Sequence, residues 1–174
     1  MLRVLSLLAV IGISVWIFSI RDHASELAAY GYPGIFIISL LANATVLLPA
    51  PGVAVVFAMG SVFNPLAVGI VSGVGSGLGE LSGYLAGFSG QVVVENTRIY
   101  NRIVPWMQKY APATIFILAA IPNPFFDLAG IASGILKIPM RTFLFWCIAG
   151  KIIKMLVFAY AGAYSIDWLF KYFK

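Results

Sequence analysis

Charged residues are scarce in this chain. Only 10% of its 174 residues are Asp, Glu, Lys or Arg, against about 25% in an ordinary soluble domain. Apolar residues make up 61% of the chain, and its mean hydropathy is +1.00. Because so few polar side chains cannot coat a water-soluble globule, we expect one integral membrane domain of the all-α class, with no room for a second, soluble domain.

Cysteine and histidine are nearly absent. The single cysteine, Cys147, excludes an internal disulfide and a cysteine metal site, and the single histidine, His23, excludes a multi-histidine metal site. We therefore expect no metal and no cofactor. The net charge of +5 is spread singly between apolar segments, which is typical of residues that face lipid headgroups and argues against a nucleic-acid partner.

Seven apolar segments follow one another along the chain. Three of them, 1–20, 66–89 and 139–164, are long enough to cross a hydrocarbon core of about 30 Å. We interpret the first as a retained N-terminal helix rather than a cleaved signal peptide, because no small-residue cleavage site follows it. The other four segments are 30–48, 52–63, 111–121 and 125–136.

Two pairs of prolines join these shorter segments. Proline removes a backbone donor and pushes the preceding residue out of the helical region, so two prolines one residue apart end a helix. Short limbs on either side of such a break reach about half of a bilayer. The pattern predicts two re-entrant hairpins, whose tips contain Pro49, Pro51 and Gly52 in the first and Pro122 and Pro124 in the second.

The two hairpins belong to a repeat. After the prolines of the first tip come Gly60 and Pro65, and after those of the second tip come Gly134 and Pro139. The offset between the halves is the same for the Gly and the Pro, and a single inserted residue separates it from the offset of the tips. The same offset sets Glu80 opposite Lys154. Following the chain across the membrane gives the two repeats opposite topology, as in many secondary transporters whose site lies near the midplane.

The domain organisation follows from the repeat. We expect an N-terminal helix and loop over 1–29, repeat 1 over 30–89, an amphipathic interfacial helix over 90–110, repeat 2 over 111–164 and an interfacial tail over 165–174. The positive-inside rule places the N-terminus in the cytoplasm. Six basic residues lie on the N-terminal side and three on the other: Arg3, Arg98, Arg102, Lys109, Lys137 and Arg141 against Arg21, Lys171 and Lys174.

Four charged residues fall near the predicted membrane centre. Glu80 lies in the middle of a helix with seven glycines, which we interpret as ridges for close packing. Lys151 and Lys154 lie in the middle of the last spanning helix, and Asp127 follows the second hairpin tip. Two interpretations stay open: a structural cluster of ion pairs, or a polar cavity that admits an anionic headgroup.

A catalytic interpretation is weak. Gly87-Phe88-Ser89-Gly90 has the Gly-x-Ser-Gly pattern of intramembrane serine proteases. The only histidine that could act as its base, His23, falls on the opposite side of the predicted membrane. We therefore expect no enzyme.

The second repeat resembles the DedA/SNARE-associated (VTT-domain) family, and within it the branch of the eukaryotic vacuole membrane protein. The resemblance rests on Pro122-Asn123-Pro124, on Asp127-Leu128-Ala129-Gly130 and on Gly150-Lys151-Ile152-Ile153-Lys154, and it extends over about 30–160. It implies inverted re-entrant hairpins and transport of lipids between leaflets. Residues that match the family's motifs are Glu80, Pro122, Asn123, Asp127, Gly150 and Lys151.

The chain also departs from the bacterial branch of that family. Val53 stands where that branch has an acid, and Ala119, Ala120 and Phe125 stand where it has arginines. These departures weaken proton-coupled uptake and favour a phospholipid scramblase over a polyprenyl-phosphate flippase. A proton-coupled transporter and a non-transporting scaffold remain the alternatives.

The expected partners are membrane lipids, either anionic phospholipid or polyprenyl phosphate, and self-association is left open. The expected location is the cell membrane. The expected headgroup site contains Glu80, Asp127, Lys151 and Lys154, together with Asn123 from the resemblance.

Overall fold

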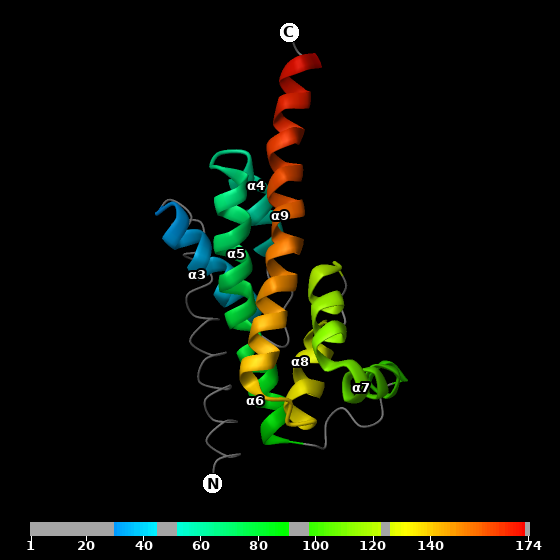
Figure 1. The fold of residues 1–174 in the computed structure, drawn as a ribbon. Coiled ribbons are helices and arrows are strands. Elements are labelled where there is room, and N and C mark those ends of the chain that lie inside the picture. The colour runs from blue at the N-terminus through cyan, green and yellow to red at the C-terminus, as the bar shows by residue number, and fades with distance from the viewer. Residues whose placement is uncertain (1–29, 45–51, 91–97, 123–125, 173–174) are drawn as a thin grey trace.

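The computed structural model describes residues 30–44, 52–90, 98–122 and 126–172. Within these ranges all regular secondary structure is helical (Figure 1), which confirms the all-α class. The predicted N-terminal helix over 1–20 lies outside the described residues. So do Pro49, Pro51, Asn123 and Pro124 from the predicted hairpin tips.

Two long helical spans form the centre of the fold. The first consists of α5 (Pro65–Gly79) and α6 (Leu81–Ser89), which join at Glu80, and the second is α9 (Met140–Tyr172). Pro65–Ser89 and Met140–Ser165 are both long and apolar enough to cross a membrane, as predicted from the sequence. The two run side by side in opposite directions (Figure 1).

Local signals explain how the first of these helices begins and where it is interrupted. The Asn64 side chain accepts hydrogen bonds from the backbone N–H groups of Leu66 and Ala67, at 3.0 and 3.3 Å, and proline follows it at the first helical position. Glu80 keeps nearly helical angles, φ −65° and ψ −10°. The predicted single helix is therefore two segments with a joint at the charged residue.

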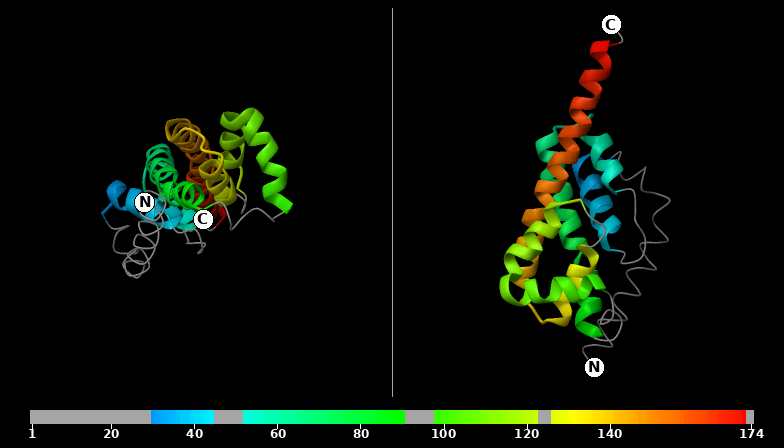
Figure 2. Two further views of the ribbon diagram at one scale, coloured as in Figure 1. Left: turned by 90° about the horizontal axis from the view of Figure 1, so that it is seen from below. Right: turned by 90° about the vertical axis from the view of Figure 1, so that its right-hand side faces the viewer.

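Helix α9 is longer than expected. It continues to Tyr172 without a break and projects beyond the rest of the bundle (Figures 1 and 2). The predicted tail over 165–174 is therefore not a separate helix but, as far as Tyr172, the last turns of α9. Whether it lies at a membrane surface stays a prediction.

In the described part of the chain, four shorter helices flank the centre. Helices α3 (Tyr32–Ala44) and α4 (Gly52–Gly60) form one pair, and α7 (Arg98–Ala120) and α8 (Phe126–Ile135) form the other. In Figure 1, α3 descends and α4 returns upward, whereas the second half of α7 ascends and α8 returns downward. The two pairs thus enter the bundle from opposite ends.

Helix α7 is kinked at Tyr110, where φ is −137° and ψ is 49°. Pro112 has no N–H to continue the helix, and its ring disfavours helical angles in the residue before it. The kink separates a first half that turns away from the bundle from a second half that packs along α9 (Figures 1 and 2). The kink lies at the expected boundary between 90–110 and 111–164. Whether the first half lies at a membrane surface stays a prediction.

The short helices pack in a crossed pattern. The first helix of each pair packs on the long helix that follows it in the chain, α3 on α5 and α7 on α9. The second helix of each pair packs on the other long helix, α4 on α9 and α8 on α6. Neither half of the chain could therefore bury its apolar surface without the other.

Glycine makes the central packing possible. A Cβ added to Gly69, Gly73 or Gly77 would overlap Leu156, Ile152 or Ile148 of α9 in turn. Gly75 and Gly79 leave the same narrow space for α3, beside Phe36 and Leu40. The interpretation of these glycines as packing ridges is confirmed, because each ridge meets the backbone of a neighbouring helix.

The apolar core is divided in two. One cluster, with Ile35, Val56, Val68, Met155 and Ala159, joins α3, α4, α5 and α9. The other joins α6, α7, α8 and the beginning of α9, and its buried residues are Tyr84, Met107, Ile115, Ala119, Phe126, Ala129, Ala132, Ile138, Phe143 and Cys147. Along each long helix, a charged residue lies between the two clusters.

We predict that Gly73→Ala destabilises the protein. Its new methyl group would lie 2.5 Å from the Cα of Ile152, and overpacking of this kind costs about 1–3 kcal/mol. The measurement is the thermal midpoint in detergent, followed by size-exclusion fluorescence. Gly90→Ala is the matched control, since no atom lies within 4 Å of its added Cβ. Equal midpoints for the two variants would contradict the close-packed ridge.

Candidate functional site

A buried ion pair lies between the two apolar clusters. Lys151 Nζ of α9 lies 2.5 Å from Glu80 Oε1 at the α5–α6 joint, and the side chains are 2% and 3% exposed. Charges so deeply buried are retained only when they are paired and hydrogen-bonded. The pair therefore ties the two long helices together near their middles.

Two further side chains complete the surroundings of Lys151. Asn43, near the end of α3, accepts a hydrogen bond from Lys151 Nζ through Oδ1 at 2.8 Å. Its amide nitrogen donates to the carbonyl of Ser39 at 2.9 Å, which orients the oxygen toward the lysine. The ring of Phe126, at the beginning of α8, lies 4.7 Å from the ammonium group, a cation–π distance.

The site thus gathers residues from both halves of the chain. Asn43 and Glu80 come from the first half, and Phe126 and Lys151 from the second. Gly130 of α8 lies beside the carboxylate, since an added Cβ would make an ordinary contact of 3.6 Å with Glu80 Oε2. We call Asn43, Glu80, Phe126 and Lys151 the polar centre.

Lys154 lies one turn further along α9 and is only 8% exposed. Its charge interacts with those of Lys151 and Glu80, but within the described ranges it forms no ion pair with a carboxylate. The repeat offset set Glu80 opposite Lys154, whereas the ion pair is made with Lys151. Lys154 is therefore a second buried cation, and it lies beside an ion pair whose two charges already balance each other.

Asp127 lies at the edge of the polar centre rather than inside it. It is in the first turn of α8, its side chain is exposed, and its charge interacts with Lys151 and Lys154. An acid in the first turn stabilises a helix through the positive end of its dipole. Asp127 is therefore the most exposed of the predicted headgroup-site residues that the structure describes.

The other expected residues divide into two groups. Pro122 is exposed at the end of α7, and Gly52 packs where its Cβ would meet that of Ala42. Asn123 and the remaining prolines lie outside the described residues. Ser89 donates its hydroxyl to the carbonyl of Ala86 in its own helix at 2.8 Å, an ordinary helix-end arrangement.

Two members of the polar centre were missed by sequence reasoning. Asn43 is the only side-chain amide in the apolar segment 30–48, and an isolated amide in a membrane helix signals an interhelical hydrogen bond. Phe126 carries no such signal, because an aromatic residue in an apolar segment is ordinary.

Buried hydroxyl groups elsewhere mostly bond within their own helices. Ser72, Ser76 and Ser133 donate to carbonyls of the preceding turn. Tyr84 is different, since its hydroxyl donates to the carbonyl of Ile138, in the turn before α9, at 2.7 Å. Its ring also stacks on that of Phe143 at 5.1 Å, which fixes the beginning of α9 against α6.

Comparison with known protein families identifies the family to which this chain belongs. The model of the VTT domain matches residues 48–164, which include both long apolar helices and most of the polar centre. The chain belongs to the VTT-domain family. Its apolar helices and this family make it a membrane protein.

A curated relative supports the same family. This VTT-domain chain is 35% identical over 74 residues to "Vacuole membrane protein KMS1" of Arabidopsis thaliana. The match covers 42% of this chain but only 18% of the relative, so the relative is a much longer protein. No solved structure gives a significant match.

We predict strong coupling within the ion pair. Glu80→Gln and Lys151→Met should each destabilise the protein by about 3–5 kcal/mol, because each leaves one buried charge without its partner. The double variant should be much less destabilised than the sum of the two. Chemical unfolding in detergent, analysed as a double-mutant cycle, measures this. Additive losses would contradict the pair.

Proposed function

We propose that this VTT-domain protein is a lipid translocase that lets headgroups pass between leaflets while the acyl chains stay in the bilayer. The observation that carries the proposal is the charged centre in the middle of two helices long enough to span a membrane. Ionisable residues at that depth are costly and mark substrate pathways in many membrane proteins. Anionic phospholipid and polyprenyl phosphate are the proposed substrates.

The proposal includes an inverted repeat of two re-entrant hairpins. The crossed packing of the short helices supports it, since each half of the chain makes the same type of contact with the other half. Reciprocal glycine contacts support it further: Gly162 meets the carbonyl of Phe57, and Gly87 meets the carbonyl of Ile131, the equivalent of Phe57 in the second repeat. Such repeats place substrate sites at the midplane, between broken helices.

The arrangement of charges suggests how a headgroup would cross. Lys151 is held by Glu80 and Asn43, whereas Lys154 forms no ion pair with an acid in the part of the chain that the structure describes. A lipid phosphate sliding past the bundle could take Lys154 as its partner and be spared full transfer into hydrocarbon. Asp127 at the edge would repel that phosphate and keep its stay short, as a translocase requires.

The location is part of the proposal. We propose the cell membrane, and the distribution of basic residues favours an N-terminus in the cytoplasm. The relative's printed name refers to the vacuole membrane, so an internal membrane is the other outcome of a localisation experiment.

A proton-coupled transporter is the second candidate. It is favoured by one observation, the burial of the Glu80 carboxylate beside two lysines, where proton uptake would change the charge of the whole centre. It requires that the transport rate depend on a pH gradient. A scaffold without transport activity would show no lipid movement either with or without a pH gradient.

The test is lipid scrambling in vesicles that contain the pure protein. A fluorescent phospholipid in both leaflets is quenched from outside with dithionite, so protein-free vesicles lose only their outer-leaflet signal. We predict a larger loss with the protein, without any gradient or nucleotide. Equal quenching in the two preparations would overturn the translocase. A rate that rises with an imposed pH gradient would favour the second candidate.

We also predict that Lys154→Met slows scrambling. A hydrogen bond to a charged group is worth about 1.5–3 kcal/mol, and about 1.4 kcal/mol is a factor of ten, so the rate should fall by about tenfold or more. Ile153→Met is the matched control, because this neighbour on α9 faces outward and is 45% exposed. A scrambling rate unchanged by Lys154→Met would show that Lys154 does not contact the headgroup.

A further inference from the structure

We propose that the end of the bundle near the α8–α9 turn holds a separate binding site for an anionic phospholipid. The site is a hollow of about 410 Å³ between the first half of α7 and that turn. Its walls include Met107, Gln108, Leu136, Lys137, Ile138 and Thr142. None of these residues belongs to the polar centre, and the inference does not depend on translocation.

The walls of the hollow suit an amphiphile. Lys137, Gln108 and Thr142 supply one cationic and two neutral hydrogen-bonding side chains, while Met107, Leu136 and Ile138 are apolar. A phosphate with its glycerol could meet the polar groups, and the first carbons of an acyl chain the apolar ones. A free anion would leave the apolar part of the hollow unused.

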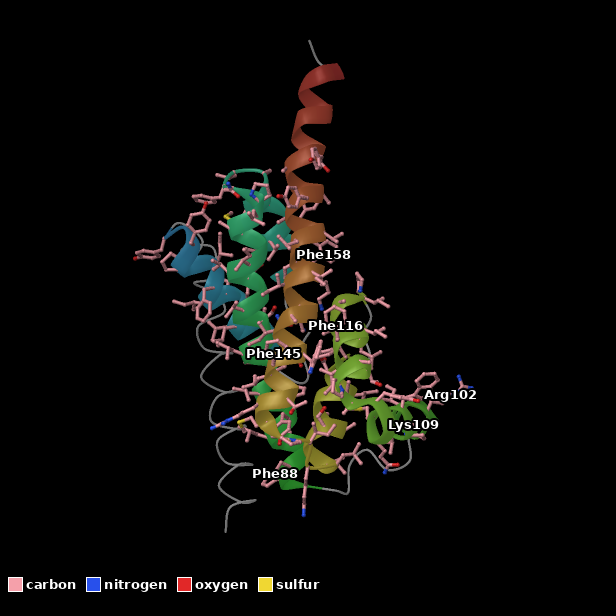
Figure 3. All side chains as sticks on the ribbon, viewed as in Figure 1. Phe88, Arg102, Lys109, Phe116, Phe145 and Phe158 are labelled. Atoms are coloured by element: carbon pink, nitrogen blue, oxygen red, sulfur yellow. The ribbon has the colours of Figure 1, made fainter. Side chains whose placement is uncertain are left out.

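Among the described residues, the exposed charges around this end of the bundle are all positive. Arg102, Lys109, Lys137 and Arg141 are all exposed around this end of the bundle. Residues 98–122 and 128–165 contain no Asp or Glu. In Figure 3, Arg102 and Lys109 lie on the part of α7 that turns away from the long helices. This complementarity favours an anionic lipid over a zwitterionic one.

The position of the hollow argues for a lipid in a membrane surface. The α8–α9 turn immediately precedes Met140, where the second apolar span begins. Trp106 and Tyr110 adjoin the lining residues Met107 and Ala111 in the sequence of α7, and they are 67% and 51% exposed. Exposed aromatic residues at the end of an apolar span are typical of the headgroup region.

The backbone presents Lys137 in a fixed and unfavourable conformation. Its φ is 52°, a left-handed angle that glycine usually occupies at the end of a helix. The turn is held by hydrogen bonds from the N–H groups of Lys137 and Ile138 to the carbonyls of Gly134 and Ser133, and by Tyr84 on the carbonyl of Ile138. These are the ordinary hydrogen bonds of a helix end, and they fix the point at which the Lys137 side chain leaves the backbone beside the hollow.

The test compares lipid binding by the full chain. Purified protein in detergent is titrated with phosphatidylglycerol or phosphatidylcholine, and bound lipids are counted by native mass spectrometry. We expect phosphatidylglycerol to bind more tightly, and Lys137→Gln to weaken it by about fivefold. Lys171→Gln, near the other end of α9, removes the same charge and should change nothing.

A second variant separates binding from folding. Lys137→Gly relieves the left-handed backbone strain, so it should keep or raise the thermal midpoint of the protein. It should nevertheless weaken the binding of phosphatidylglycerol as much as Lys137→Gln does. Equal affinity for the two lipids in the unaltered protein, or full affinity in both variants, would overturn the inference. Selective binding without scrambling would overturn only the translocase, and scrambling without selective binding only this site.

Discussion

The fold depends on one electrostatic constraint: two opposite charges are buried between apolar clusters and must remain together. Glu80 and Lys151 lie on different long helices, and Asn43 brings a third helix to the same point. In an apolar surrounding the separation of this pair would leave a charge that neither water nor backbone can solvate. The long helices are therefore fixed in register near their middles, and the shorter helices pack around that register.

Glycine residues let α5 and α9 approach closely enough for Glu80 and Lys151 to form their ion pair. The helices approach through Gly69, Gly73 and Gly77 on one ridge, where a larger residue would push α9 away from α5. Separation of these helices would also lengthen the distance between Glu80 and Lys151. Packing and electrostatics thus favour the same arrangement, and a change in either weakens the other.

Sequence patterns predicted most of this architecture but not its central contact. Proline spacing and apolar length predicted the helix pairs and both long helices, because these depend on local backbone chemistry. The repeat offset identified Lys154 as the counterpart of Glu80, yet equivalence in a repeat is not contact. Lys151 and Lys154 lie one turn apart on α9, and only the packing of α3 and α8 decides which of them meets the carboxylate. The kink at Tyr110 was not predicted, although Pro112 supplies a local cause for it. The role of Phe126 depends on tertiary structure alone.

We propose that the two helix pairs enter the membrane from opposite sides and meet at the charged centre. Cysteine labelling tests it most directly, in a protein whose only cysteine is replaced by Cys147→Ala. Val62→Cys, in the turn after α4, and Met140→Cys, at the beginning of α9, are placed at positions 69% and 41% exposed. With an impermeant maleimide, we expect one of these cysteines to be labelled only in right-side-out vesicles and the other only in inside-out vesicles. Labelling of both from the same side would contradict it.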